Sequence, residues 1–376
     1  MKKPEKYKIL ISGGGTGGHI FPAIAIANGL KEKLKEVDIL FVGAKGRMEM
    51  EKVPMAGYPI EGLWISGIQR RLTLKNLLFP VKLLSSLWKA ARIVKAFQPN
   101  VAIGTGGYAS GPLLKMAASK GVPTLILEQN SYPGIANKWL GRSVDKICTA
   151  YTGMEKYFPA DKIILTGSPV RKNILQLQTG TAEGRQFFGL ERDRKTLLIV
   201  GGSQGAKRIN EAMAHIVEKV LATGIQLIWQ TGKPSLDMAE KAVLNSTYRK
   251  RVKIVAFIHQ MEQAYAAADL VVSRAGAIAI AEIVQVKKPA IFIPLPSAAE
   301  DHQTHNAKAL VVKGAALMVK EKEAAEKLFG LISNLMKDNE ARDKMISELK
   351  QFEHGNATEK IVNEVQELIL KRKIGA

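Results

Sequence analysis

Residues 9–19 read Ile9-Leu10-Ile11-Ser12-Gly13-Gly14-Gly15-Thr16-Gly17-Gly18-His19. A short apolar run ends in a turn with five glycines in six positions, and an apolar-rich segment at helical spacing follows over 20–34. This order predicts a strand, a tight loop and a helix whose N-terminus faces a ligand. Unpaired backbone N–H groups and the positive end of the helix dipole favour an anion there, and glycines let the backbone approach it closely.

The same turn satisfies the G-x-G-x-x-G pattern of dinucleotide-binding folds at Gly13, Gly15 and Gly18. That pattern expects an acidic residue about 20 positions further on, where it would hold a ribose after the second strand. The second expected strand, 38–42, instead runs into Gly43-Ala44-Lys45-Gly46-Arg47 without a carboxylate at its end. A nicotinamide-dependent oxidoreductase is therefore the less favoured interpretation.

Length and composition indicate a globular protein. The chain has 376 residues, 46% of them hydrophobic and 24% charged, which is enough for two ordinary globular domains. Its single cysteine, Cys148, excludes an internal disulfide and suggests a reducing compartment. No apolar run approaches the roughly 18 residues of a membrane span, and no signal peptide is recognisable. We therefore expect a cytoplasmic protein without a span.

The net charge of +21 implies anionic partners, such as nucleic acid, phosphorylated ligands or an acidic membrane surface. The basic residues are scattered and aromatic residues make up only 6%, so no compact module for stacking bases is found. A non-catalytic basic protein that binds nucleic acid or membrane stays an alternative. It would leave the glycine turn and His19 without a purpose.

The chain alternates strand-like runs with helical patterns, which is typical of parallel sheets covered by helices. In the first half the expected strands are 8–12, 39–42, 101–104, 124–127, 146–149 and 162–165. The composition changes near 166–172, and a strand (196–200), a glycine turn (201–206) and an amphipathic helix (209–221) then repeat the opening pattern. Further strands are expected at 226–229, 253–256, 270–273 and 290–294. The sequence predicts two similar nucleotide-binding halves.

Other strands also end in turns suited to ligands, at the edge where open α/β sheets bind them. In the first half these turns are Gly104-Thr105-Gly106-Gly107-Tyr108 and Glu128-Gln129-Asn130. In the second half Arg274-Ala275-Gly276-Ala277 opens a helix that carries Glu282, within reach of sugar hydroxyls on a ligand whose phosphate sits at the helix start. An ordinary solvated helix carboxylate is the alternative for Glu282.

A basic, apolar segment spans 67–97. No acidic residue occurs from 66 to 120, and leucines, Phe79 and Trp88 alternate with lysines and arginines. An amphipathic helix with a basic rim lies well on an anionic membrane surface. The alternative is a surface helix whose apolar face belongs to the core. We predict membrane docking through Leu77, Leu78, Phe79 and Trp88.

Taken together, these motifs resemble the MurG family of peptidoglycan N-acetylglucosaminyltransferases, within glycosyltransferase family 28. The matching pieces occur in family order from residue 8 to about 310; besides the turns already quoted they are Pro169-Val170-Arg171, Gly201-Gly202-Ser203-Gln204-Gly205 and Asp301-x-Gln303-x-x-Asn306. The resemblance implies an α/β GT-B fold with two Rossmann-like domains facing across a cleft. Its expected parts are an acceptor and membrane-docking domain (1–167), a UDP-sugar domain (168–350) and a C-terminal helix (351–376) packing on the first.

The implied reaction is inverting transfer of N-acetylglucosamine from UDP-N-acetylglucosamine to the 4-hydroxyl of the muramyl sugar of lipid I. The products are lipid II and UDP, and the enzyme would sit peripherally on the cytoplasmic face of the inner membrane, serving peptidoglycan synthesis. A related transferase acting on another lipid, such as diacylglycerol, is the main alternative within this class.

The resemblance also assigns residues. The family binds the sugar nucleotide at the positions of Thr16, Gly17, Gly18, Asn130, Arg171, Ser203, Ile258 and Gln303. Glu282 falls where the family holds the ribose, and Asn306 falls where it lines the donor sugar. His19 and Tyr108 resemble the acceptor-side pair, with His19 as the favoured general base. Two positions depart from the family: Ser168 replaces a frequent asparagine, and Ala279 replaces a threonine whose hydroxyl lies near the diphosphate.

The chemistry agrees with this assignment. Helix N-termini and an arginine can stabilise a UDP leaving group without a metal, and histidine titrates near neutral pH as a general base should. Asp301, His302 and His305 find no further ligand to complete a metal site. We therefore expect no cofactor and no metal. The expected partners are UDP-N-acetylglucosamine, undecaprenyl-linked lipid I and an anionic membrane surface, and not nucleic acid.

Overall fold

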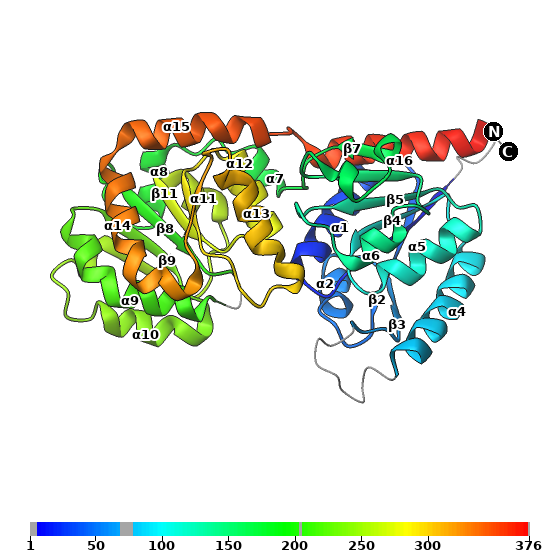
Figure 1. Cartoon of the computed structure of the whole chain (residues 1–376), viewed down its shortest axis with the longest axis horizontal. Coiled ribbons are helices and arrows are strands. Elements are labelled where there is room, and N and C mark those ends of the chain that lie inside the picture. The colour runs from blue at the N-terminus through cyan, green and yellow to red at the C-terminus, as the bar shows by residue number, and fades with distance from the viewer. Residues whose placement is uncertain (1–5, 68–77, 203–204, 375–376) are drawn as a thin grey trace. The chain divides into compact units, whose positions relative to one another are not determined.

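A computed structural model describes residues 6–67, 78–202 and 205–374 (Figure 1). The chain divides into two compact units. The first unit consists of residues 1–170 together with 354–376, and the second unit consists of residues 171–353. Each unit contains one parallel sheet with helices on both faces, so the predicted pair of similar α/β halves is confirmed.

The first unit is built on a seven-stranded sheet in the order β3-β2-β1-β4-β5-β6-β7, in which the paired strands run parallel. Its strands are β1 (Tyr7–Gly13), β2 (Val37–Ala44), β3 (Ile60–Leu63), β4 (Val101–Gly106), β5 (Thr124–Glu128), β6 (Lys146–Thr149) and β7 (Ile163–Leu165). The order reverses between β1 and β4, so the turns after these two strands lie side by side. A ligand site of an open α/β sheet is expected at such a point.

Two separate hydrophobic clusters cover the two faces of this sheet. On one face α1 (Gly17–Lys33), α2 (Glu49–Met55) and α16 (Ala357–Ile374) pack with alternate residues of β1 and β4, including Ile9, Ile11 and Ile103. On the other face lie α4 (Phe79–Phe97), α5 (Ser110–Ser119) and α6 (Ile135–Leu140), against Leu10 and Ala102. The period of two along each strand is what a sheet buried on both sides requires.

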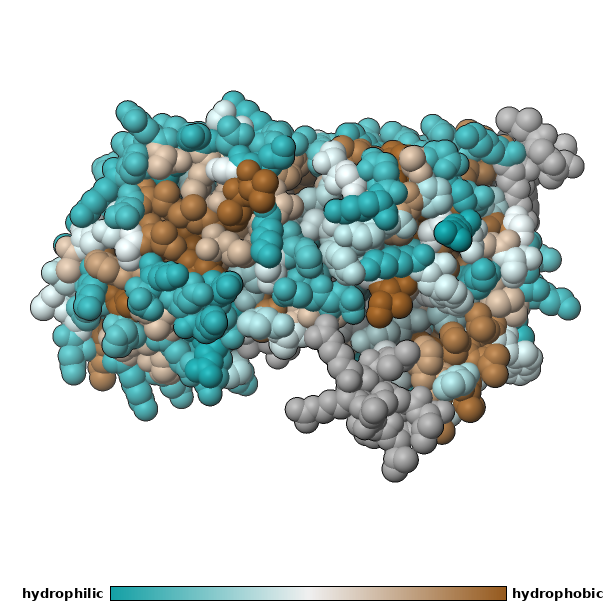
Figure 2. Space-filling view, in the orientation of Figure 1, coloured by the Kyte–Doolittle hydropathy of each residue, from teal (hydrophilic) through white to brown (hydrophobic). Residues whose placement is uncertain are grey.

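Helix α4 keeps a row of apolar side chains on its outer surface, and Figure 2 shows apolar residues gathered there. Leu78, Val81, Leu84 and Trp88 are 48%, 52%, 68% and 63% exposed. Phe79, by contrast, packs against the core beneath the helix. Among the described helices, none combines the length and the apolar character needed to cross a bilayer.

The second unit is built on a six-stranded sheet in the order β10-β9-β8-β11-β12-β13. Its strands are β8 (Thr196–Val200), β9 (Gln226–Gln230), β10 (Val252–Val255), β11 (Leu270–Ser273), β12 (Ala290–Phe292) and β13 (Leu317–Met318). Its helices are α7 (Lys172–Leu175), α8 (Thr181–Phe187), α9 (Lys207–Ala222), α10 (Leu236–Ala242), α11 (Met261–Ala267), α12 (Ala277–Gln285), α13 (His302–Val311), α14 (Ala324–Lys337) and α15 (Asn339–Leu349). Leu197 and Ile199 face α9 and α14, while the alternate Leu198 is fully buried on the opposite face.

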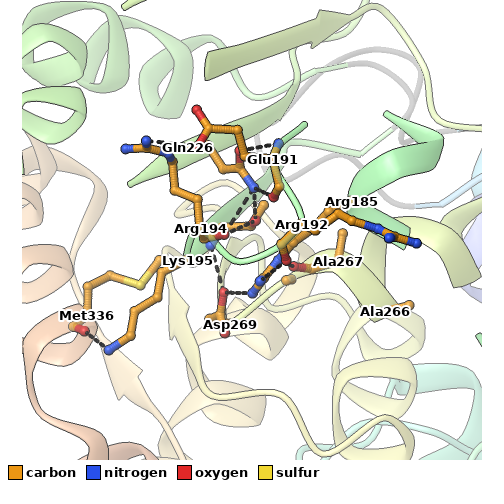
Figure 3. Close-up of polar contacts among 12 residues, drawn as sticks. Arg185, Glu191, Arg192, Arg194, Lys195, Gln226, Ala266, Ala267, Asp269 and Met336 are labelled. Atoms are coloured by element: carbon orange, nitrogen blue, oxygen red, sulfur yellow. Dashed lines mark hydrogen bonds and ion pairs between the residues drawn. The ribbon is translucent and has the colours of Figure 1, made fainter. Parts of the chain in front are cut away.

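A polar network ties down the amino ends of β8 and β11 (Figure 3). Arg185, which is 7% exposed, donates from Nη2 to Asp269 Oδ2 at 2.7 Å. The same oxygen accepts the N–H of Thr196 at 2.6 Å. Lys195 Nζ donates to the carbonyl of Met336 at 2.8 Å and so joins β8 to the end of α14. The network holds the sheet at the end remote from the glycine turn that follows Val200.

Several predicted boundaries differ from the structure. Helix α1 begins at Gly17, inside the glycine run and before the predicted segment 20–34, and α4 begins at Phe79, within the predicted segment 67–97. Residues 72–77 lie outside the described part of the chain. Strands β3 and β13 carry no sequence prediction, because each is a short edge strand defined by its pairing with one neighbour.

Candidate active site

The turn after β1 brings the backbone to the start of α1. Gly15 adopts φ +83°, a left-handed conformation that favours glycine, and Thr16 is extended with φ −144°. Gly17 and Gly18 are the first two residues of α1, so their N–H groups lie where a helix has no internal partners. The predicted strand, glycine turn and helix N-terminus are therefore present in the fold.

The turn after β4 fixes the ring of His19. His19 Nδ1 lies 2.8 Å from the carbonyl oxygen of Thr105. A carbonyl oxygen can only accept, so Nδ1 carries the hydrogen and Nε2 bears the lone pair of the neutral imidazole. Thr105 Oγ1 donates back to the carbonyl of His19 at 2.7 Å. Gly106 has φ +104°, and a Cβ there would lie 2.5 Å from His19 Nδ1.

Tyr108 lies beside the same turn. Its side chain is 46% exposed, and a Cβ on Gly15 would lie 3.9 Å from its ring. The guanidinium carbon of Arg47 lies 6.0 Å from the centre of the Tyr108 ring. The structure thus brings His19 and Tyr108, predicted as a pair, to one glycine turn.

The turn after β5 is organised by a buried carboxylate. Glu128 is 2% exposed and accepts hydrogen bonds from the N–H of Asn130 at 2.9 Å, from Asn130 Nδ2 at 3.2 Å and from Asn137 Nδ2 at 2.9 Å. Burial raises the pKa of Glu128, although these hydrogen bonds act in the opposite direction. Asn130, a predicted nucleotide contact, is therefore held in place by Glu128, two positions before it.

In the second unit Arg171 and Glu282 form a two-pronged ion pair. Arg171 Nε donates to Glu282 Oε1 at 2.6 Å and Nη2 donates to Oε2 at 2.8 Å, while Tyr265 Oη donates to Oε2 at 3.2 Å. Burial alone would lower the pKa of Arg171, but the hydrogen bond and charge of Glu282 outweigh it and raise that pKa. Glu282 is 3% exposed, so it is not the solvated carboxylate of the alternative interpretation.

A carboxylate offers about four acceptor positions, and Arg171 and Tyr265 use three of those on Glu282. One position remains for the ribose hydroxyl that the family resemblance predicts. Glu282 also has a second task, which is to orient the Arg171 guanidinium.

Two further predicted residues lie around the start of α13. Gln303 Oε1 accepts the N–H of Leu295 at 2.9 Å, and Asn306 is fully buried with Nδ2 3.5 Å from the carbonyl of Ala275. Glu300 and Asp301, which lead into α13, both adopt left-handed backbone conformations with φ of 52° and 50°. Non-glycine residues in this region are strained and concentrate at functional sites.

Ile258 and the glycine turn after β8 are joined by Gln230. The N–H of buried Ile258 donates to Gln230 Oε1 at 2.9 Å, and Gln230 Nε2 donates to the carbonyl of Gly202 at 3.1 Å. Ser203, another predicted nucleotide contact, lies outside the described residues, as does Leu77 of the docking segment. Within the described ranges, no group of three or more His, Cys, Asp or Glu side chains is placed to hold a metal ion.

Three residues that organise these turns carried no sequence prediction: Glu49, Gln230 and Tyr265. Gln230 had a usable signal, since it is a polar residue that ends the otherwise apolar run 227–229. Tyr265 contacts Glu282, 17 positions further on, and Glu49 contacts Gly15, 34 positions back, so only the folded chain shows these contacts.

The chain matches two models of one family. Residues 9–149 match the glycosyltransferase family 28 N-terminal domain, and residues 196–361 match the glycosyltransferase family 28 C-terminal domain.

Relatives of nearly equal length carry one name, UDP-N-acetylglucosamine--N-acetylmuramyl-(pentapeptide) pyrophosphoryl-undecaprenol N-acetylglucosamine transferase. The protein from Cytophaga hutchinsonii is 51% identical over 98% of this chain and 99% of its own length. The protein from Flavobacterium psychrophilum is 48% identical over 98% of this chain and the whole of its own length.

Two solved structures are similar to this chain over nearly its whole length. The crystal structure of Acinetobacter baumannii MurG superposes with a TM-score of 0.80 at 27% identity, covering 96% of this chain and 100% of that one. A glycosyltransferase of kitacinnamycin superposes with a TM-score of 0.69 at 14% identity, covering 97% of this chain and 100% of that one, which is a likeness of fold alone.

Proposed function

The chain belongs to glycosyltransferase family 28, and on that premise we propose how its residues carry out one reaction. The reaction is transfer of N-acetylglucosamine from UDP-N-acetylglucosamine to lipid I, which gives lipid II and UDP. The names of the full-length relatives favour this acceptor over diacylglycerol. The observation that carries the proposal for the chemistry is the fixed tautomer of His19.

His19 acts as the general base on the acceptor. The hydrogen bond from Nδ1 to the Thr105 carbonyl leaves Nε2 as the nitrogen that can take a proton. The 4-hydroxyl of the muramyl sugar attacks the anomeric carbon of the donor and gives its proton to Nε2. The electron pair of the bond from the anomeric carbon to the phosphate oxygen leaves with UDP, so the configuration inverts. Tyr108, beside the same turn, contacts the acceptor.

The second unit holds the donor. Negative charge grows on the diphosphate as UDP leaves, and fixed positive groups that await this charge lower the barrier. The guanidinium of Arg171 and the N-terminal N–H groups of α12, which starts after the extended Gly276, are such groups. The Arg171 side chain is 44% exposed although two of its nitrogens are bound to Glu282, so it can still contact a ligand.

The donor also needs contacts to its base and sugar. The turn at Ile258, joined to the glycine turn 201–205 through Gln230, receives the uracil. Glu282 contacts the ribose through its remaining acceptor position. Gln303, at the start of α13, contacts the N-acetylglucosamine, whereas the predicted donor contact Asn306 is fully buried and lies behind the site, against the carbonyl of Ala275.

Docking to the membrane through α4 would bring the enzyme to its lipid-linked acceptor. The exposed row Leu78, Val81, Leu84 and Trp88 is bordered by cations, and the Arg92 guanidinium lies 4.7 Å from the centre of the Trp88 ring. Apolar side chains with a basic rim suit the boundary of an anionic bilayer. This supports a peripheral position on the cytoplasmic face of the inner membrane.

The test is UDP release from UDP-N-acetylglucosamine with a lipid I analogue, measured in EDTA. We expect release that depends on the analogue, survives EDTA and falls at least about 100-fold in His19→Ala, as loss of a general base requires. His215→Ala, an exposed histidine on α9, is the matched control and should retain wild-type activity. Release with diacylglycerol instead of lipid I would overturn the acceptor, and equal rates in the two variants would overturn the role of His19.

A further inference from the structure

Glu49 places a buried carboxylate directly beneath the glycine turn. It is the first residue of α2 and is 1% exposed. Its Oε2 accepts the N–H of Gly15 at 2.8 Å, and its Oε1 accepts the N–H of Ala44 at 2.9 Å. One planar group therefore binds the turn after β1 with one oxygen and the end of β2 with the other.

The chain makes room for this carboxylate at two glycines. A Cβ on Gly14 would lie 2.2 Å from Glu49 Oε1, and a Cβ on Gly43 would lie 2.5 Å from Glu49 Cγ. Neither distance is compatible with a side chain, so both positions must be glycine for Glu49 to pass between them. Gly14 thus serves a packing contact that is separate from ligand binding.

The two contacts require a carboxylate. Each backbone N–H is a donor, and only an ionised carboxylate offers an acceptor oxygen to both; glutamine would direct an NH2 group at one of them. Burying a charge is costly, and among the described residues no Lys or Arg forms an ion pair with Glu49. The two backbone donors and the N-terminus of α2 offset this cost. The Glu49 carboxylate therefore fixes the backbone positions of Gly15 and Ala44, to which it is hydrogen-bonded.

The backbone segment that Glu49 holds is connected directly to His19. Gly15 precedes Thr16, from which the first turn of α1 begins, and His19 lies in that turn. On the opposite side the N–H of Gly14 donates to the carbonyl of Gly106 at 3.2 Å. The glycine turn is therefore held between Glu49 and the turn that also binds the His19 ring through Thr105.

We propose that Glu49 is a positioning residue for the acceptor side of the site: its carboxylate holds the backbone of Gly15 so that His19 keeps its place at the acceptor hydroxyl. The consequence for catalysis rests on the proposed function. The consequence for the turn itself does not, because it follows from the two hydrogen bonds alone.

The experiment compares Glu49→Gln with Glu51→Gln, which removes the same charge from the same helix at a side chain that is 70% exposed. We expect Glu49→Gln to lower kcat with the lipid I analogue about 10- to 100-fold, the cost of a small misplacement of a reacting group. The calorimetric stoichiometry for UDP-N-acetylglucosamine should equal that of wild type, and its KM should change less than kcat does, since Arg171, Glu282 and other predicted donor contacts lie in the second unit. Glu49→Asp keeps both acceptor oxygens and should recover part of the loss.

Amide hydrogen exchange is read on the same proteins. We expect faster exchange of the peptide 13–19 in Glu49→Gln and unchanged exchange in residues 171–353. If wild type were inactive toward lipid I, the proposed function would fail while the exchange measurement still judged Glu49. The inference is overturned if Glu49→Gln matches Glu51→Gln in kcat and exchange. It is also overturned if the fall in rate equals the fall in the fraction of molecules that bind UDP-N-acetylglucosamine. Should Glu49→Gln not fold, the same comparison is made with Glu49→Asp, which must then exceed Glu51→Gln in both effects.

Discussion

Arg171 and Glu282 meet as a fork, with Nε 2.6 Å from Oε1 and Nη2 2.8 Å from Oε2. Arg171 lies at the start of the second unit and Glu282 lies in α12, so the pair joins segments 111 residues apart in the chain. Both residues were predicted to contact the sugar nucleotide, one at the phosphates and one at the ribose. The structure makes each the partner of the other, so the two proposed donor contacts depend on a single geometry.

Arg171→Lys should therefore weaken donor binding even though the charge is kept. A lysine ammonium cannot bond both oxygens of Glu282 in parallel, and it is free to leave the position in which the guanidinium is held. We expect the KM for UDP-N-acetylglucosamine to rise about tenfold or more. Arg249→Lys, an exposed arginine before β10, should leave this KM unchanged. Equal values for the two variants would show that the fork has no role in donor binding.

Gly106→Ala should abolish most activity through the His19 ring. The residue has φ +104°, and the new Cβ would lie 2.5 Å from His19 Nδ1. We expect a loss of stability of about 1–3 kcal/mol from backbone strain and a fall in kcat of about 100-fold from displacement of the imidazole. The measurements are urea unfolding and UDP release.

The matched control for this prediction is Gly57→Ala. Gly57 also has a left-handed backbone, with φ +82°, but a Cβ there would meet nothing within 4 Å. It should lose stability to a similar extent and retain full activity. A similar loss of kcat in both variants would mean that strain alone explains the effect of Gly106→Ala.

Acidification should weaken the fold through His354. Burial, assisted by the charge of Lys360, lowers the pKa of His354 below 6.5, although a hydrogen bond with the backbone of Ala150 opposes this. The unfolded chain then takes up a proton at higher pH than the folded chain does, so stability is complete above pH 6.5 and falls as the pH drops through 6.5 toward the lowered pKa.

The measurement is urea unfolding between pH 8 and pH 5.5 for wild type and two variants. His354→Asn should flatten the decline in this window, whereas His215→Asn, at an exposed position on α9, should keep the wild-type slope. An unchanged slope in His354→Asn would assign the pH dependence to other groups.

Membrane binding should depend on the outer row of α4. Replacing Leu84 and Trp88 together by serine removes side chains that are 68% and 63% exposed. We expect binding to anionic vesicles to fall about 10- to 100-fold, from the apolar surface that no longer enters the bilayer. Turnover of a soluble acceptor analogue should be unaffected.

Leu244→Ser is the control, because Leu244 is 68% exposed in the second unit and lies outside this row. Serine at the sequence-predicted trio Leu77, Leu78 and Phe79 is a poorer test, since Phe79 packs against the core and its loss would cost stability. Unchanged vesicle binding in the Leu84 and Trp88 double variant would exclude α4 as the docking surface.

Much of the fold could be predicted from sequence because buried parallel strands are apolar runs that end in glycine. Strands β1 and β4 end in glycine and β8 is followed directly by one, so the two halves repeat the rule, whereas β5 ends in the polar run Glu128-Gln129-Asn130. Strand β3 escaped because Ile60-Glu61-Gly62-Leu63 is neither apolar throughout nor regularly alternating. Its place is set by pairing with β2, which is a tertiary property.

Site residues that lie in or next to a turn after a strand could be predicted from sequence. Residues that hold such a turn from another segment of the chain could not. His19, Tyr108 and Asn130 lie in or next to glycine-rich or polar turns after strands. Glu49 lies five residues after the end of β2, at Ala44, and its contact with Gly15 spans 34 positions. No local pattern distinguishes such a carboxylate from a solvated one, because its burial depends on Gly14 in the turn after β1 and on Gly43 in β2.

Helix α16 has a consequence for how the protein is made. Its residues Ile361, Val365 and Leu368 complete the core that α1 shares with β1 and β4, yet the 183 residues of the second unit (171–353) lie between α16 and the rest of that core. At ribosomal rates of about 5–20 residues per second, this interval lasts about 10–40 s. During this interval the side of α1 that α16 covers stays exposed, while the whole second unit is synthesised. The unit that is synthesised first is therefore the one that is finished last.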